Sequence, residues 1–174
     1  MLTKKLLLMT GAFVLLGSFL FGQEYQYIGA AKCKMCHNSE KSGFQYKIWS
    51  EKKHANALKS LDSPESWAYA KANGIADPNK EQSCLKCHST YHAVDEDLIL
   101  TLTESEGVSC ESCHGPGSKY KAMNIMKSRE LSLANGLILP VKEVCEQCHN
   151  KDNPFYKPFN YEEAVKKIAH PTPK

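Results

Sequence analysis

Cys110-Glu-Ser-Cys113-His114 has the pattern C-x-x-C-H, from which the fold can be inferred. The pattern occurs four times and uses all eight cysteines of the 174-residue chain. The other copies are Cys33-Lys-Met-Cys36-His37, Cys84-Leu-Lys-Cys87-His88 and Cys145-Glu-Gln-Cys148-His149. We number the four motifs in chain order, so that Cys110–His114 is the third motif.

C-x-x-C-H is the sequence signal for covalent attachment of haem. Cysteines three residues apart lie on one face of a helical turn, so both can bond vinyl groups of one porphyrin. The histidine that follows supplies the proximal iron ligand. We therefore predict four haem c groups, bound through Cys33, Cys36, Cys84, Cys87, Cys110, Cys113, Cys145 and Cys148, with proximal ligands His37, His88, His114 and His149.

Three other uses of the cysteines were weighed. Four disulfides are the usual expectation for an exported chain with eight cysteines, but they need no histidine after each pair. Two Cys₄ zinc sites would also leave the four histidines unexplained. Redox motifs of the thioredoxin type would need a βαβ pattern, which this chain lacks.

The N-terminus has the layout of a secretory signal peptide. Lys4 and Lys5 precede an apolar run, Leu6 to Phe21, and polar residues follow Gly22. We predict a signal peptide at residues 1–22, one tetrahaem cytochrome domain at residues 23–174, and a periplasmic or otherwise exported protein. The apolar run has 16 residues, fewer than the roughly 20 that span a bilayer, and an uncleaved membrane anchor is the alternative.

The predicted fold is mainly α, with short helices and loops packed around four covalently bound haems. The mature chain has only about 38 residues for each haem, too few for a side-chain core of ordinary size. Capping signals predict a helix after Ser39, another after Ser63-Pro64 and a third after Asn160. The segment Leu98 to Thr103 is the one predicted strand.

The histidine count limits how the irons are ligated. Of seven histidines, only His54, His92 and His170 lie outside the motifs, so they are the candidate distal ligands for four irons. At least one iron is therefore open, takes a methionine such as Met123 or Met126, or borrows a ligand from another molecule. His92 follows His88 by four residues, about 6 Å along a helix, and cannot reach the opposite face of the same haem.

Three stretches resemble the cytochrome c-554 family, the tetrahaem c-type cytochromes known as electron acceptors from hydroxylamine oxidoreductase. Residues 107–117, Gly-Val-Ser-Cys-Glu-Ser-Cys-His-Gly-Pro-Gly, resemble the third haem site of that family. Residues 49–58 resemble the segment after the first motif, and residues 158–170 resemble the C-terminal helix of the family.

The resemblance implies a mainly helical fold with haems in stacked pairs, and close haem packing at the glycines around Pro116. It also implies that His54 caps the haem of His114 and that His170 caps the haem of His149. The family places a histidine after the Gly-Pro-Gly turn to cap the first haem, whereas this chain has Ser118-Lys119-Tyr120 there. The second haem of the family is five-coordinate, so His92 could cap either the first or the second haem.

The predicted function is that of an exported electron carrier between redox proteins, including a membrane-bound quinol-side or oxidoreductase partner. One alternative is a haem enzyme that reduces a small nitrogen oxide at an open iron, with Tyr91, His92 and Tyr120 as proton donors. Another is an electron-transfer subunit of a larger cytochrome assembly. The formal net charge is only +3 and no basic stripe occurs, so nucleic acid binding is not expected.

Overall fold

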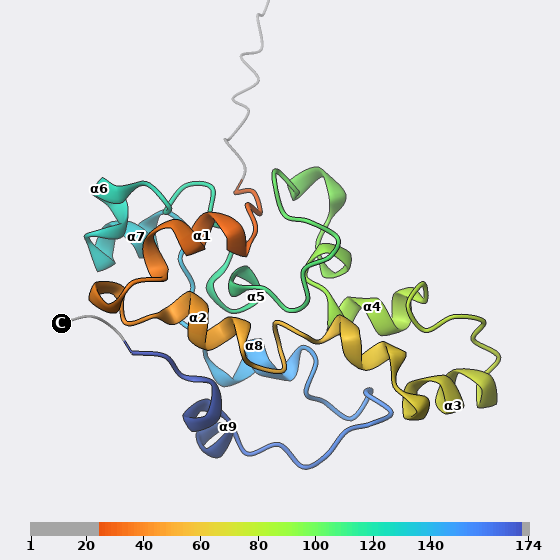
Figure 1. Cartoon of the computed structure of the whole chain (residues 1–174). Helices are drawn as coiled ribbons and strands as arrows, with labels where there is room; N and C mark the ends of the chain where they lie inside the picture. The colour runs from red at the N-terminus through yellow and green to blue at the C-terminus, as the bar shows by residue number, and fades with distance from the viewer. Residues whose placement is uncertain (1–24, 172–174) are drawn as a thin grey trace, which may run out of the picture.

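The computed structural model describes residues 25–171, and the predicted signal peptide therefore lies outside the described residues. Short helices joined by long loops make up this part of the chain, and it contains no β-strand (Figure 1). The elements in chain order are α1 (Ala30–His37), η1 (Glu40–Ser42), α2 (Gln45–Ser50), η2 (Leu58–Asp62), α3 (Pro64–Ala72), α4 (Gln82–His88), η3 (Tyr91–Ala93), η4 (Glu96–Leu98), α5 (Cys110–His114), α6 (Met123–Met126), α7 (Arg129–Ala134), α8 (Lys142–Glu146) and α9 (Tyr161–Ile168). The predicted mainly α fold with short helices is confirmed.

Two of the predicted helix starts agree with the structure. The hydroxyl of Ser63 accepts a hydrogen bond from the N–H of Ser66, with Pro64 in the first turn of α3. The side chain of Asn160 accepts from the N–H of Glu163 at the start of α9. These side chains satisfy amide groups that the first turn of a helix leaves unpaired.

Two other predictions of local structure were wrong. Ser39 caps only the 3₁₀ turn η1, because Gly43 ends that turn with a φ of 83° and α2 begins separately at Gln45. The segment 98–103 is not a strand, since its pairing is limited to one parallel bridge between Ile99 and Tyr27. One bridged pair of residues does not make the repeated ladder of hydrogen bonds that a strand needs.

The side-chain core of residues 25–171 is small. Its buried apolar members are Ile28, Ala30, Leu61, Ala70, Leu85, Leu102 and Tyr120. Larger apolar side chains remain exposed in the chain alone, and the side chain of Met35 is 81% exposed. Because folded domains normally bury most of such residues, the interior requires material that the side chains do not supply.

A buried carboxylate ties the N-terminal segment to the third motif. Glu111 is 2% exposed and accepts hydrogen bonds from the N–H groups of Ile28, Gly29 and Gly117 at 2.7–3.1 Å. Glu106 accepts from the N–H of Ala30 at 2.8 Å. Burial raises the pKa of Glu111, while the three N–H groups act in the opposite direction. The start of α1 is thus fixed against α5 by side chains of residues 106–111.

The glycines around Pro116 approach protein atoms. A Cβ on Gly115 would lie 2.7 Å from the carbonyl oxygen of Gly136, and one on Gly117 would lie 2.9 Å from Cδ1 of Ile28. We expected these glycines to allow a haem to approach closely, and this explanation is therefore incomplete. They also let the chain pack closely on itself beside the third motif.

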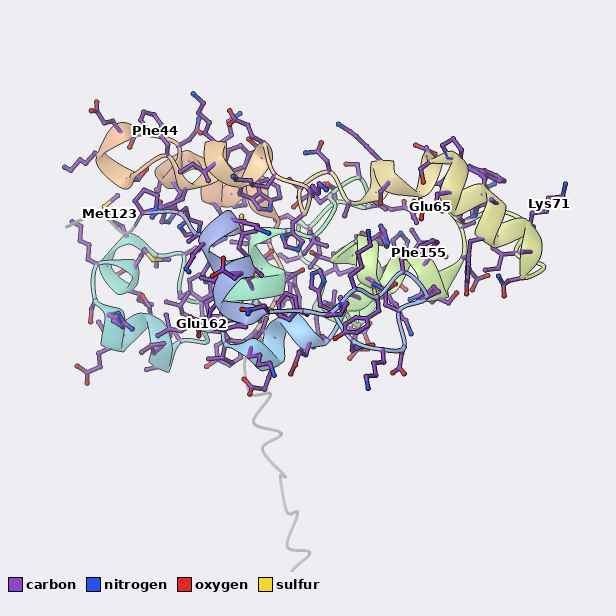
Figure 2. All side chains as sticks on the ribbon, turned by 90° about the horizontal axis from the view of Figure 1, so that it is seen from below. Phe44, Glu65, Lys71, Met123, Phe155 and Glu162 are labelled. Carbon is purple, nitrogen blue, oxygen red and sulfur yellow. The ribbon has the colours of Figure 1, made fainter. Side chains whose placement is uncertain are left out.

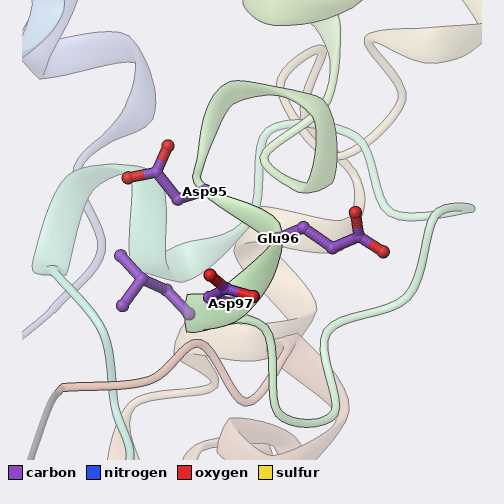
Figure 3. A pocket seen from close by; sticks show the side chains of 4 residues that line it. Asp95, Glu96 and Asp97 are labelled. Atoms are coloured by element: carbon purple, nitrogen blue, oxygen red, sulfur yellow. The ribbon is translucent and has the colours of Figure 1, made fainter.

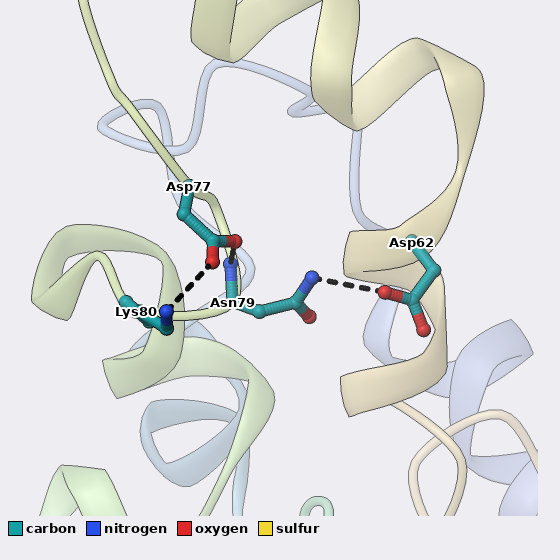
Figure 4. A network of polar contacts seen from close by, with 4 residues as sticks. All are labelled: Asp62, Asp77, Asn79 and Lys80. Atoms are coloured by element: carbon teal, nitrogen blue, oxygen red, sulfur yellow. Dashed lines mark hydrogen bonds and ion pairs between the residues drawn. The ribbon is translucent and has the colours of Figure 1, made fainter.

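The connection between α3 and α4 is held by polar side chains (Figure 4). The side-chain amide of Asn79 donates to Asp62 at 2.9 Å, and its backbone N–H donates to Asp77 at 2.9 Å. The ammonium group of Lys80 lies 3.5 Å from Asp77. These bonds attach the loop before the second motif to η2.

None of the helices within residues 25–171 is both long enough and apolar enough to cross a membrane.

Candidate haem-binding sites

Each C-x-x-C-H motif occupies a short helix or its end. The first motif forms the last turns of α1, the second ends α4, and the third is α5 itself. The fourth begins in α8 and ends in the turn that follows. The helical backbone of the first three motifs, and the turn that continues α8 at the fourth, bring the two cysteines of each motif close together, as the attachment of one porphyrin requires.

Three of the four motif histidines bind a protein oxygen through Nδ1. The Nδ1 of His37 lies 2.6 Å from Oε1 of Gln45, that of His88 lies 2.9 Å from the carbonyl oxygen of Ala57, and that of His114 lies 3.2 Å from the carbonyl oxygen of Ile138. A carbonyl oxygen can only accept, so Nδ1 carries the proton and Nε2 keeps its lone pair. This is the arrangement of a histidine that ligates a metal through Nε2.

The fourth motif histidine, His149, is oriented by stacking. Its ring lies parallel to that of Phe159, with centroids 5.0 Å apart and an interplanar angle of 10°. On another side it meets the ring of His54, with centroids 5.9 Å apart and an interplanar angle of 79°. A spare histidine from the segment after α2 thus lies against the fourth motif.

A second histidine pair joins the third motif to the C-terminal segment. The rings of His114 and His170 have centroids 5.9 Å apart and are inclined by 46°. Two imidazoles that bind one metal from opposite sides, with bonds of about 2 Å, have centroids about 6 Å apart. Both histidine pairs match the spacing that two axial ligands of one iron would need.

The pairing of the rings differs from what the family resemblance implied. His54 lies against His149 and His170 lies against His114, whereas the resemblance implied the opposite partners. Two backbone contacts fix the position of His54. Its carbonyl oxygen accepts from the N–H of Val108 at 2.9 Å, and a Cβ on Gly107 would lie 2.7 Å from the same oxygen. The residues just before the third motif therefore direct His54 toward the fourth motif.

Burial favours the neutral form of the paired histidines. It lowers the pKa of His54, His114 and His170, and neutral imidazole is the form that ligates metals. The Nδ1 of His170 is also buried without a hydrogen-bond partner. Such an atom is costly in a folded protein unless it has another partner, and a metal would provide one.

His37 and His88 belong to no histidine pair within residues 25–171. His92 does not lie against either ring: it contacts Tyr91, at a centroid distance of 5.3 Å, and its Nε2 lies 3.6 Å from Glu104. Of the two candidate methionines, Met123 is 66% exposed and Met126 is partly buried. The structure thus brings two of the three spare histidines to motif histidines and leaves His92 apart.

A cavity of about 1840 Å³ runs along three of the motifs. Its walls include Cys87, Cys113, Cys145, Cys148, His88 and His149. Pockets for single small ligands usually measure about 300–1,000 Å³, so this one has room for more than one large group. Cysteines, free Nε2 atoms and volume together fit haem at these motifs.

Cysteines of different motifs lie close to one another in space, and these pairs give the motifs a spatial order. The thiol of Cys33 lies near that of Cys110, and the thiol of Cys87 lies near that of Cys148. Cys113 lies near Cys145. Correspondingly, α1 packs against α5 and α5 packs against α8. The motifs therefore form a row in space in the order first, third, fourth, second.

All eight cysteines are unpaired, and residues 25–171 contain no cluster of three or more His, Cys, Asp or Glu side chains suited to a bare metal ion.

Comparison with known proteins agrees with this site. The family described as cytochrome c554 and c-prime matches residues 32–115, which include the first three motifs. Cytochrome c-554 of Nitrosomonas europaea is 29% identical over 129 residues, covering 68% of this chain. Both matches support the cytochrome c-554 family. The family implies a c-type cytochrome with covalently bound haem, and the chain spans about half the length of the curated relative it matches. No solved structure matches the chain.

Sequence reasoning missed the residues that orient the motif histidines. Gln45, Ile138 and Phe159 lie 8, 24 and 10 residues from the histidines that they contact. Ile138 uses its backbone carbonyl oxygen and Phe159 uses the face of its ring, and neither kind of contact leaves a recognisable pattern in the sequence. Only Gln45, the first residue of α2, has a polar side chain that could have been proposed from the sequence as the partner of His37.

Proposed function

We propose that this c-type cytochrome is an exported electron carrier that holds four haems and passes electrons between two redox proteins. A bound haem c supplies a reversible one-electron couple. The chain supplies the attachment cysteines and the ligands. His37, His88, His114 and His149 would be proximal ligands, and His54 and His170 would be distal ligands of the fourth and third haems.

The observation that carries the proposal is the row of motifs. Cys33 lies near Cys110, Cys113 near Cys145 and Cys148 near Cys87, so neighbouring attachment sites follow one another in a row. A continuous row of redox centres suits transfer of electrons from one end of a molecule to the other. A substrate-converting site would need no such row, because its chemistry takes place at one centre.

One observation favours a second function. His88, which lacks a paired histidine, and His92 both line the large cavity. An open iron at His88 with an imidazole nearby could bind and reduce a small nitrogen oxide. To support this second function, the reduced protein must convert the nitrogen oxide to product and not only bind it.

The test uses purified holoprotein. Haem content by the pyridine haemochrome assay should give four haems per chain, and a potentiometric titration should reduce all four reversibly. Electron paramagnetic resonance of the oxidised protein should show two low-spin irons from the two histidine pairs and two irons of other ligation. Turnover of nitric oxide, nitrite or hydroxylamine by the fully reduced protein would replace the carrier proposal with the enzyme. Fewer than four haems would contradict the proposed row.

A further inference from the structure

The first motif lies in the most basic part of the chain. Residues 32–59 contain seven lysines, all of them exposed, and only two carboxylates. The lysines are Lys32, Lys34, Lys41, Lys47, Lys52, Lys53 and Lys59. They lie on α1, η1, α2 and the loop and turn that follow, and α1 and α2 pack against each other.

Two of these lysines lie beside aromatic rings. The ammonium group of Lys34 lies 5.4 Å from the ring centroid of Tyr46, and that of Lys47 lies 5.9 Å from the ring centroid of Phe44. Phe44 is 40% exposed, and Met35, next to Lys34, is 81% exposed. We call Lys34, Met35, Phe44 and Lys47 the basic patch; Figure 2 shows Phe44 at one end of the molecule.

The backbone of Phe44 is held in an unusual conformation. Its φ of 53° and ψ of 31° place it in the left-handed region, which a bulky L-residue rarely adopts. Its N–H donates to the carbonyl oxygen of Ser39, and its own carbonyl oxygen accepts from Ile48. The fold thus maintains strain that leaves an aromatic ring partly in solvent, a combination typical of binding surfaces.

Another part of the surface has the opposite charge. No lysine or arginine occurs between Lys86 and Lys119, and this segment exposes Asp95, Glu96, Asp97 and Glu104. Asp95, just before η4, and Glu96 and Asp97 within it carry three of these carboxylates (Figure 3). An acidic protein would be attracted to the basic patch and repelled from this segment.

We infer that the basic patch is the docking surface for an acidic redox protein, which exchanges electrons at the first motif. The inference rests on the proposed function and adds the place and charge of one partner. Lys34 and Met35 directly precede the exposed Cys36 in the chain, so docking there brings a partner close to one end of the row of motifs. Lysines around an apolar centre fit a partner with carboxylates around its own apolar contact.

The experiment uses holoprotein and a reduced plant-type ferredoxin, an acidic one-electron protein, as the probe. Stopped-flow absorbance gives the second-order rate constant of haem reduction over a range of salt concentrations. One variant combines Lys34→Glu with Lys47→Glu. The matched control combines Lys71→Glu with Lys151→Glu, which changes the net charge equally but at exposed lysines elsewhere, Lys71 lying at the end opposite Phe44 (Figure 2).

At low salt we expect the patch variant to be slower than the wild type by roughly tenfold or more, and the control by less than about threefold. The difference should shrink at high salt because exposed charges are screened. Phe44→Asn, which tolerates the left-handed conformation, should slow reduction at every salt concentration.

Equal rates for the two double variants, or a wild-type rate independent of salt, would overturn the inference. A lipid-binding role would also overturn it. In that case the wild type and the control would sediment with phosphatidylserine vesicles, the patch variant would not, and the ferredoxin rates of all three would be the same. A small-molecule reductant separates the two proposals. If it reduces all four haems but ferredoxin does not, docking fails and the carrier stands; if it reduces none, the carrier proposal itself fails.

Discussion

The two ends of the row of motifs are built differently. Around the first and third motifs the chain forms its own interior, with Ile28, Leu102 and Tyr120 buried and Glu111 bonded to three backbone N–H groups. Around the second and fourth motifs most of the interior is the large cavity, and Leu61 and Leu85 are the buried apolar side chains nearby.

This difference indicates where the fold depends on its prosthetic groups. Side-chain contacts and capping bonds hold α1 against α5 in the chain alone. The helices around the cavity have few apolar partners, so most of their stabilisation must come from the groups that fill it. The four attachment sites should therefore not contribute equally to stability.

The largest expected effect comes from removing one attachment site at each end. Cys145→Ala with Cys148→Ala should lower stability by at least about 4 kcal/mol, which corresponds to a fall in the unfolding midpoint of roughly 10 °C or more. Cys33→Ala with Cys36→Ala should cost about half as much, because Glu111 and the local core remain. Haem content and thermal unfolding measure both variants. Equal losses of stability would remove the contrast between the two ends.

The next prediction concerns the histidine pairs. His54→Ala and His170→Ala should each convert one low-spin iron to high-spin, because each removes one imidazole of a pair. The pairs differ in interplanar angle, 79° for His54 with His149 and 46° for His114 with His170, so the two variants should remove different low-spin signals in electron paramagnetic resonance. His92→Ala is the control and should leave both signals. Loss of a low-spin signal in that control would refute the pairing.

The histidines show how far the sequence could be interpreted. C-x-x-C-H identifies His37, His88, His114 and His149 from covalent geometry, which requires only local spacing. Choosing partners for His54 and His170 depends on where segments 50 or more residues apart meet. The contact of His54 with Val108 and Gly107 decides that choice, and no pattern in the sequence encodes it. Counting histidines therefore predicts a shortage of ligands, whereas the partners that the family resemblance implies differ from the ring pairs in the structure.

The contribution of Glu111 was also not predictable, because it occupies a variable position of the third motif. Glu111→Ala would leave three buried N–H groups without an acceptor and should cost about 2–3 kcal/mol. Denaturant unfolding monitored by circular dichroism measures the loss. Glu143→Ala, at an exposed carboxylate in α8, is the control and should change stability by less than about 0.5 kcal/mol. Similar losses in both variants would show that the buried carboxylate does not stabilise the first end.

The same residue predicts a dependence on pH. Burial raises the pKa of Glu111, so the folded protein keeps this proton at pH values where the unfolded chain has already released it. Stability from this group is complete below the ordinary carboxyl pKa and decreases as pH rises through the raised value. The difference in stability between wild type and Glu111→Ala should therefore become smaller across that range. A difference that grows with pH would mean that the N–H bonds outweigh burial.

The smallest expected effect lies outside both ends of the row. Asn79→Ala removes a hydrogen bond to Asp62 and should cost about 0.5–1 kcal/mol without changing any haem signal. Lys80→Ala, the neighbouring control, removes only an exposed ion pair and should cost less. If Asn79→Ala instead altered the spectrum of the second haem, the loop before α4 would help to position His88. The second end would then depend on its protein loops as well as on the groups in its cavity.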